Sequence, residues 1–230
     1  MTFRTEVQQR PGLGLTPKSQ LAELLISSLK EVGASFAKSE LAYLALTQKV
    51  EHAIRDKLAF NLHRRLERES PDLLVCREWK RADLAVVKCK KPLLVLEAKA
   101  IYSFDIVKSG AQHPFPKLVS EDLEKAAKHA SSTPADFPLE TFSLVIATHP
   151  RTAPGAEYRE AVKYFRNVKK YAVETNTFVN ASQIMNQKMA NLGLELLHKD
   201  EVNAGNAFRV DVSVFLWLYT PAHNSEPPNA

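Results

Sequence analysis

The feature that most constrains the fold is the run Pro92-Leu93-Leu94-Val95-Leu96-Glu97-Ala98-Lys99-Ala100-Ile101. Its first half is continuously apolar, which is typical of a strand buried on both faces. Its second half places a carboxylate and an ammonium group two residues apart. Because side chains alternate along a strand, Glu97 and Lys99 point to the same side. Two charges at the end of a buried strand are costly to desolvate unless each interacts with a partner or a ligand there. The run therefore predicts a central strand that carries a polar site.

The segments around this run predict a helix, three strands, a second helix and a fourth strand. The first helix is expected over 39–69 with Ser39 as its N-cap, after a shorter helix over 18–32. The strands are expected at 73–79, 82–88, 93–103 and 142–148. Short separators make the first three strands antiparallel neighbours, whereas a helix over 120–130, with Ser120 as its N-cap, makes the fourth a candidate for parallel pairing with the third.

The remainder of the chain predicts two further helices and two added strands. The helices are expected over 155–172 and 181–192, and the strands over 194–198 and 208–219, joined by a turn at 203–206. The expected fold is α/β, with a mixed central sheet flanked by helices. A flexible arm (1–17), a single domain (18–220) and a disordered tail (221–230) complete the predicted organisation.

Composition indicates an ordinary soluble protein. Of the 230 residues, 45% are hydrophobic and 25% are charged, and the net charge of +5 permits a polyanionic partner without requiring one. Cys76 and Cys89 show no metal-ligand spacing and are interpreted as buried thiols of a reduced compartment. The N-terminus lacks an apolar signal region, and the apolar run from Val212 to Tyr219 is too short to span a bilayer. We expect a cytoplasmic protein that is not inserted in a membrane.

The pattern Glu-x-Lys occurs twice, and its context separates the two copies. Glu78-Trp79-Lys80 ends in a predicted hairpin turn, where charges are normally solvated. Glu97-Ala98-Lys99 instead follows a hairpin partner that bears Asp83, fourteen residues before Glu97. That length allows two antiparallel strands to bring the two carboxylates near one another.

Glu51 is the charged residue that stands out on the long helix. Leu46, Val50, Ile54, Leu58, Leu62 and Leu66 recur every four residues and form an apolar face. Glu51 lies on the inward side among these leucines. The alternative interpretation, favoured when this helix is considered alone, is a flanking residue that pairs with Arg55 at i+4.

A helix with an inward Glu51, then Asp83 on the second strand, then apolar residues leading into Glu97-Ala98-Lys99, then a helix and a strand, resembles the PD-(D/E)XK nuclease superfamily. The resemblance covers roughly residues 39–148 and implies the restriction-endonuclease-like fold. Two features depart from the family pattern: Ala82 precedes Asp83 where many members have Pro, and no Gln-x-x-x-Tyr follows the motif.

The resemblance implies an endonuclease that cleaves phosphodiester bonds with Mg²⁺, for which Mn²⁺ can substitute. Asp83, Glu97 and the Ala98 carbonyl would hold the metal, Glu51 would assist, and Lys99 would orient the attacking water or stabilise charge. The implied partner is nucleic acid, with double-stranded DNA favoured, and a homodimer stays open.

Basic residues of the predicted helix over 155–172 and of flanking loops are candidate phosphate contacts: Arg159, Lys163, Arg166, Lys170, Lys117, His113 and Arg151. Asp122, Glu124 and Lys125 could line the cleft, although a helix N-terminal turn explains the acids equally well. Two alternatives stay open. The trio of Asp83, Glu97 and Lys99 could be a structural ion-pair cluster, or the chain could be a non-catalytic nucleic-acid-binding or assembly protein on the same fold.

Overall fold

The computed structural model describes residues 17–108, 115–128, 139–172 and 177–222, so most of the predicted tail (221–230) and all but the last residue of the predicted arm (1–17) lie outside the described residues. The helices are α1 (Pro17–Lys30), α2 (Glu40–Thr47), α3 (Glu51–Glu69), α4 (Ser103–Lys108), α5 (Phe115–Lys128), α6 (Phe165–Tyr171) and α7 (Thr177–Asn191), with short 3₁₀ turns η1 (Gly33–Ser35) and η4 (Ala156–Tyr158). The strands are β1 (Leu74–Trp79), β2 (Ala82–Lys88), β3 (Lys91–Tyr102), β4 (Glu140–Pro150), β5 (Leu194–Ala207) and β6 (Val210–Pro221).

The strands form one mixed sheet in the order β1-β2-β3-β4-β6-β5. Strand β3 pairs with β4 in parallel, and all other neighbours in the sheet are antiparallel. The two predicted hairpins and the parallel pair after the helical crossover are therefore confirmed. The α/β class, with a mixed sheet between helices, is confirmed as well.

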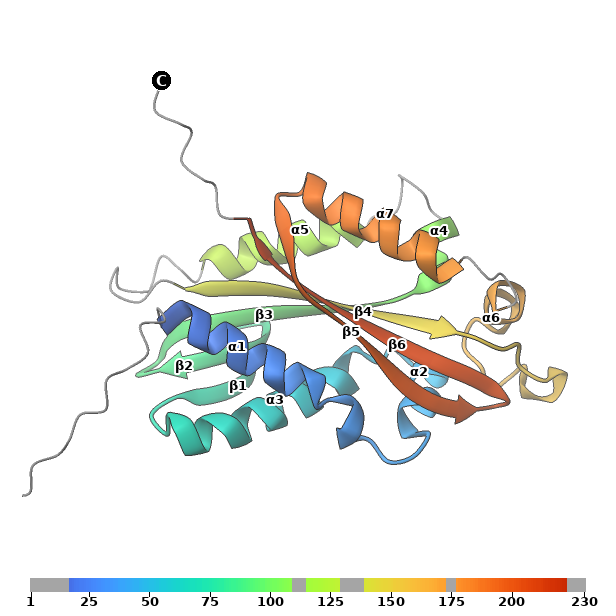
Figure 1. Ribbon diagram of the computed structural model, residues 1–230, viewed down its shortest axis with the longest axis horizontal. Coiled ribbons are helices and arrows are strands. Elements are labelled where there is room, and N and C mark those ends of the chain that lie inside the picture. Colours follow the sequence, from blue (N-terminus) through green and yellow to red (C-terminus); the bar gives the residue numbers. More distant parts are fainter. Residues whose placement is uncertain (1–16, 109–114, 129–138, 173–176, 223–230) are drawn as a thin grey trace, which may run out of the picture.

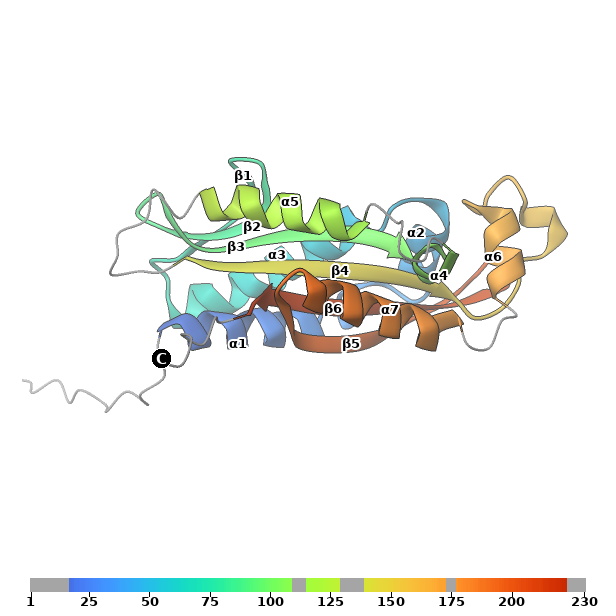
Figure 2. The same cartoon turned by 90° about the horizontal axis from the view of Figure 1, so that it is seen from above.

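Helices cover both faces of the sheet. Helices α1, α2 and α3 lie against one face, and α4, α5 and α7 lie against the other (Figure 1). Helix α6 lies at one end of the molecule in both views (Figures 1 and 2). Within the described part of the chain, no helix is both long enough and apolar enough to cross a bilayer.

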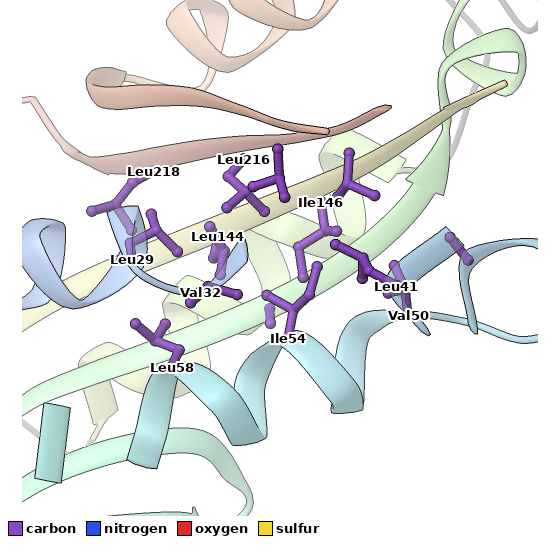
Figure 3. Packing of buried hydrophobic residues seen from close by; sticks show 14 of the residues in the cluster. Leu29, Val32, Leu41, Val50, Ile54, Leu58, Leu144, Ile146, Leu216 and Leu218 are labelled. Carbon is purple, nitrogen blue, oxygen red and sulfur yellow. The ribbon is translucent and has the colours of Figure 1, made fainter. Parts of the chain in front are cut away.

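The larger core lies between the sheet and the layer of α1, α2 and α3. Figure 3 shows Ile54 and Leu58 of α3 facing Leu144 and Ile146 of β4, with Leu29 of α1 beside them. These five side chains are completely shielded from solvent. The four-residue periodicity of α3 therefore marks the face that packs on the sheet, as the sequence predicts.

The alternation of β3 positions the candidate site. Leu94, Leu96 and Ala98 join the core beneath α1, α2 and α3, so the odd-numbered residues face the opposite layer. On that side Val95 packs with Ala85 and Val87 of β2. Glu97 and Lys99 consequently project toward the layer that contains α5. The apolar half of β3 is buried on both faces, as its composition predicts.

The prediction of one continuous helix over 39–69 is wrong. Helix α2 ends at Thr47, Gln48 adopts an extended conformation (φ −146°, ψ −178°), and α3 begins at Glu51. The apolar periodicity persists through the break because Leu46 and Val50 are both buried, so periodicity alone does not reveal it. Ser39 does precede α2, but it has a left-handed backbone (φ +62°) and makes no side-chain capping bond.

The prediction that the second helix begins at Ser120 is also wrong. Residues 103–108 form α4, and α5 already begins at Phe115. Pro116 then occupies the first turn of α5, where a proline lacking its N–H costs no helical hydrogen bond. Ser120 is consequently inside the helix, and Asp122 lies near its middle rather than in its first turn.

The predicted helix over 155–172 is broken. The chain forms η4 and then turns, and α6 begins only after Tyr164, whose φ is +56°. The last hairpin is also longer than predicted, because β5 continues to Ala207 and the turn is made by Phe208 and Arg209. The predicted turn at 203–206 instead contains a register shift within β5.

The two cysteines differ in exposure. Both thiols are free, as the sequence predicts, but only Cys76 is partly buried, whereas Cys89 is exposed. Cys89 belongs to the two-residue turn between β2 and β3, where it and Lys90 both have positive φ. The interpretation of Cys89 as a buried thiol is therefore wrong, because a turn at a sheet edge cannot bury it.

Candidate functional site

Asp83 and Glu97 are brought together by the hairpin of β2 and β3. Leu84 pairs with Leu96 in this hairpin, so the next residues along the two strands are Asp83 and Glu97. The Asp83 Oδ2 atom accepts a hydrogen bond of 2.8 Å from the backbone N–H of Ala98. The side chain of Glu97 is 8% exposed. Two carboxylates therefore lie at adjacent positions on the α5 side of the sheet.

Strand β3 extends well beyond the end of its partner β2, which begins at Ala82. The backbone N–H groups of Ala98 and Ala100 consequently lack strand partners on that side and are met by carboxylates. Asp83 accepts from Ala98, and Glu51 Oε2 accepts from Ala100 at 3.0 Å. A buried N–H group without an acceptor lowers the stability of the fold, so these two groups need acceptors. Each carboxylate therefore contributes to the structure as well as to the charge of the site.

Glu51 reaches the site from the first residue of α3, where it is half-buried. The alternative pairing with Arg55 is not what the structure contains. Arg55 is buried and contacts Asp56 at 3.1 Å, Glu78 at 3.3 Å and Asp83 at 3.5 Å instead. Glu51 is thus directed at the end of β3, as the inward position on the helix predicts.

Lys99 is held by an acid of α5. Its Nζ atom lies 2.6 Å from Asp122 Oδ2, and Lys125 Nζ lies 2.9 Å from Asp122 Oδ1. Sequence reasoning names Asp122 but leaves its role open, because Asp122 was expected in a solvated first helical turn. The helix start is the information that sequence reasoning lacks. In a helix that begins at Phe115, Asp122 lies two turns from the N-terminus and faces the sheet, where it meets Lys99.

The electrostatics of the site centre on Glu97. Burial, followed by the charges of Asp83 and Asp122, raises the pKa of Glu97 to about 8. Burial works against the charged form of Lys99, but Asp122, Glu51 and Asp83 outweigh it and raise the pKa of Lys99. Lys99 is therefore held in its protonated form, whereas burial and the neighbouring acids Asp83 and Asp122 disfavour ionisation of Glu97.

A cavity of about 420 Å³ contains this group of charges. It is lined by Lys80, Arg81, Ala82, Asp83, Glu97, Lys99, Asp122 and Lys125. Lys80 and Arg81 form the turn between β1 and β2 and are both exposed, with φ values of +48° and +78°. Left-handed backbone is unfavourable for such residues. The acidic pair thus lies inside a cavity whose rim carries cations.

The donor set fits a hard divalent cation that uses few protein ligands. Among the described residues, no group of three or more His, Cys, Asp or Glu side chains is arranged to hold a metal ion. Mg²⁺, however, commonly binds through one or two carboxylates and keeps several waters for itself and its phosphate ligand. Asp83 and Glu97 offer such a pair. Burial and the charges of Asp83 and Asp122 raise the pKa of Glu97, and a cation bound between the two carboxylates would favour the ionised form of Glu97.

The four basic residues that the sequence predicts to lie on one helix are distributed over two segments. Arg159 follows η4, Lys163 lies in the turn before Tyr164, and Arg166 and Lys170 are on α6. Each of three cations in this segment lies over an aromatic ring: Arg159 over Phe165, Lys163 over Tyr164 and Lys170 over Tyr171. A continuous track along one helix face is therefore wrong, because Tyr164 breaks the helix. Their nucleic-acid contacts stay a prediction.

The other predicted phosphate contacts are dispersed. Lys117 on α5 is 80% exposed and lies 3.8 Å from Glu121. Arg151, after β4, bonds to the Ser213 hydroxyl at 2.7 Å and pairs with Glu201. His113 lies outside the described residues. Within the described chain, the cations that line the acidic cavity are Lys80, Arg81, Lys99 and Lys125. Sequence reasoning names Lys99 as a site residue and Lys125 as a candidate lining residue, and it does not name Lys80 or Arg81.

Comparisons with known proteins give no further constraint. No protein-family model, no curated protein and no solved structure matches the chain. The function must therefore be inferred from the cavity itself: two adjacent carboxylates, a lysine fixed by a third carboxylate, and a cationic rim.

Proposed function

We propose that the chain is a metal-dependent nuclease of the restriction-endonuclease-like fold that hydrolyses phosphodiester bonds, with DNA as its substrate. The observation that carries this proposal is that Asp83, Glu97 and Lys99 line one open cavity from two adjacent strands. The element order α3-β1-β2-β3-α4-α5-β4, with β3 and β4 parallel, accompanies it. Fold alone does not fix function, so the argument depends on the site.

The roles follow from the chemistry of the side chains. Asp83 and Glu97 would hold Mg²⁺ or Mn²⁺ together with the Ala98 carbonyl. When bound there, the metal supplies a water of lowered pKa and neutralises charge on the phosphate. Lys99 stays protonated beside Asp122, so it orients the attacking water and stabilises the charge that develops on phosphate oxygens.

The outer residues have supporting roles. Glu51 fixes the end of β3 through Ala100 and assists from the far side of Lys99. Lys80, Arg81 and Lys125 at the rim are suited to the phosphates that flank the scissile one. Cytoplasmic location and a homodimer belong to this proposal as expectations.

The competing proposal is a non-catalytic nucleic-acid-binding or assembly protein. It is favoured by the structural bonds of Asp83 and Glu51 to the β3 backbone, which give both acids a purpose without any metal. The two proposals differ in what they expect of Glu97 and Lys99. A nuclease requires both side chains for cleavage, whereas a non-catalytic protein cleaves nothing.

The test is incubation of the full chain with supercoiled plasmid, linear duplex and single strands, with and without Mg²⁺ or Mn²⁺. We expect cleavage that requires the metal and is lost in Asp83→Ala, Glu97→Ala and Lys99→Ala. Lys88→Ala is the matched control, because Lys88 pairs with Asp72 at 2.7 Å outside the cavity. If cleavage survives all three substitutions, the assignment of these residues as the nuclease site is refuted. If the wild type binds nucleic acid without cleaving it, the competing proposal is favoured.

A further inference from the structure

A second cavity, of about 220 Å³, adjoins the acidic one. It shares Lys99 with it and contains Glu51. Its other walls come from the α2–α3 link, the ends of β3 and β4, the start of α5 and the turn before α6, among them Gln48, Ile101, Phe115, Leu118, Thr148 and Tyr164. Its volume is below the ~300–1,000 Å³ usual for drug-sized ligands, so it suits a small planar group.

Tyr164 presents an aromatic ring at this cavity. The residue is 51% exposed, so its ring is accessible from solvent. Its ring meets that of Tyr102 edge-on, with centroids 5.6 Å apart and an interplanar angle of 89°. Tyr102 is in turn fixed by a hydrogen bond of 2.6 Å from its hydroxyl to the Ala45 carbonyl. The exposed ring therefore rests on a rigid support.

The backbone at Tyr164 is held in an unfavourable conformation. Its φ of +56° lies in the left-handed region, which costs about 1–3 kcal/mol for a residue other than glycine. The neighbouring Lys163 N–H donates to the Leu46 carbonyl at 2.7 Å, and the Val168 N–H donates to the Tyr164 carbonyl at 3.0 Å. These bonds keep a strained residue with its side chain at the mouth of a cavity. Strain of this kind is concentrated at ligand-binding positions.

The remaining lining combines apolar surface with hydrogen-bonding groups. Leu118 is 45% exposed, whereas Phe115 and Ile101 are buried. Gln48 supplies an amide, Thr148 a hydroxyl, Asp105 a carboxylate and Lys49 an exposed cation. Flat apolar faces with hydrogen-bonding edges are what a nucleobase offers, and aromatic side chains bind unpaired bases by stacking.

We propose that this cavity binds an unpaired nucleobase adjacent to the phosphate held at Lys99. The inference rests on the nuclease proposal and specifies its substrate: nucleic acid with single-stranded character at the cleavage site. A base within a duplex is stacked and paired, so it can enter only after extrusion, which costs a few kcal/mol. Single strands and unpaired ends avoid that cost.

Binding of fluorescent oligonucleotides to the full chain tests the inference, in EDTA so that no metal-dependent cleavage is needed. Tyr164→Asn removes the ring while suiting left-handed backbone, and Tyr164→Phe keeps the ring. Tyr43→Asn is the matched control, because Tyr43 on α2 is 53% exposed and lies outside the cavity, beside Phe208. Thermal melting verifies that each variant is folded.

We expect Tyr164→Asn to weaken single-strand affinity by about 5- to 100-fold, the loss of one base–aromatic stack, and Tyr164→Phe and Tyr43→Asn to stay within about twofold of wild type. Duplex affinity should be unchanged in all variants. The inference is overturned if Tyr164→Asn and Tyr43→Asn behave alike, if duplex affinity falls as much as single-strand affinity, or if no oligonucleotide binds.

The experiments distinguish failure of the nuclease proposal from failure of the base-cavity proposal. If Tyr164-dependent strand binding is observed but the plasmid assay with Mg²⁺ shows no cleavage, the base cavity stands and the nuclease assignment fails. If cleavage depends on Asp83 and Glu97 but Tyr164→Asn keeps wild-type affinity and strand preference, the nuclease assignment stands and the base cavity is refuted.

Discussion

Replacing Glu97 by Gln should make the protein more stable in alkaline solution. The pKa of Glu97 rises from an ordinary value of 4.5 to about 8 in the folded protein, mainly through burial and the charge of Asp83. A carboxyl with a raised folded pKa contributes stability that is complete below its unfolded pKa and is lost as the pH rises through the folded value. Gln keeps the shape of the side chain and has no proton to lose.

The size of the effect follows from the shift. At about 1.4 kcal/mol per pH unit, the wild type should lose about 4 kcal/mol between about pH 5 and about pH 9, relative to Glu97→Gln. That is a large part of the ~5–15 kcal/mol by which domains are usually stable. Urea unfolding of both proteins in EDTA across this range measures the difference directly.

Addition of Mg²⁺ gives a second arm of the same experiment. A cation between Asp83 and Glu97 favours the ionised carboxyl, so Mg²⁺ should stabilise the wild type at alkaline pH and have little effect on Glu97→Gln. A difference between the two proteins that stays constant with pH would refute the reasoning about burial and charge. If Mg²⁺ changes the stability of the wild type and of Glu97→Gln by the same amount at every pH, the assignment of Glu97 as a metal ligand is refuted.

Three further changes test other parts of the molecule. Leu58→Ala, in the core beneath the sheet, should lower the free energy of unfolding by about 2–5 kcal/mol in urea titrations. Replacing Lys80-Arg81 by Asn-Gly, which suits left-handed turns, should raise stability by about 1 kcal/mol and weaken DNA binding with a shallower salt dependence in anisotropy titrations. Asp122→Asn should lower the pKa of Lys99 and move the alkaline limb of the cleavage–pH profile to lower pH.

Matched controls separate these effects from general damage. Leu74→Ala, at a 60% exposed position, should change stability little, and an equal loss would contradict the burial argument. Asn-Gly in place of Cys89-Lys90 relieves the same kind of turn at the other hairpin, so stability should rise with DNA affinity unchanged. Glu121→Gln removes a neighbouring acid of α5 that faces Lys117, and an altered pH profile in this variant would contradict a specific role for Asp122.

The half of the site on β2 and β3 follows from the sequence because short hairpins leave few alternatives. Short separators predict that the strands are antiparallel neighbours, and in the structure the register between β2 and β3 places Asp83 opposite Glu97. The buried run of β3 predicts its central position, and the helical crossover before β4 predicts the parallel pairing. These features depend on contacts that are local or that span a single crossover.

The rest of the site depends on tertiary contacts that periodicity does not report. The pattern of α2 and α3 continues through the break at Gln48, although the break makes Glu51 the first residue of a helix. Tyr164 adopts a left-handed conformation without the Gly or Asn that normally signals one. Asp122 meets Lys99 only because α5 starts at Phe115 and crosses β3. Each case is a long-range constraint that overrides local preference.

The carboxylates that meet the overhanging end of β3 have a consequence for association between molecules. A strand with free N–H groups is a template on which another chain can add a strand. Asp83 and Glu51 occupy the donors of Ala98 and Ala100 and place negative charge there, which discourages such pairing. The residues that make the cavity acidic thus also keep the sheet from growing, so loss of Asp83 should favour self-association unless the replacement, such as Asn, retains an acceptor oxygen.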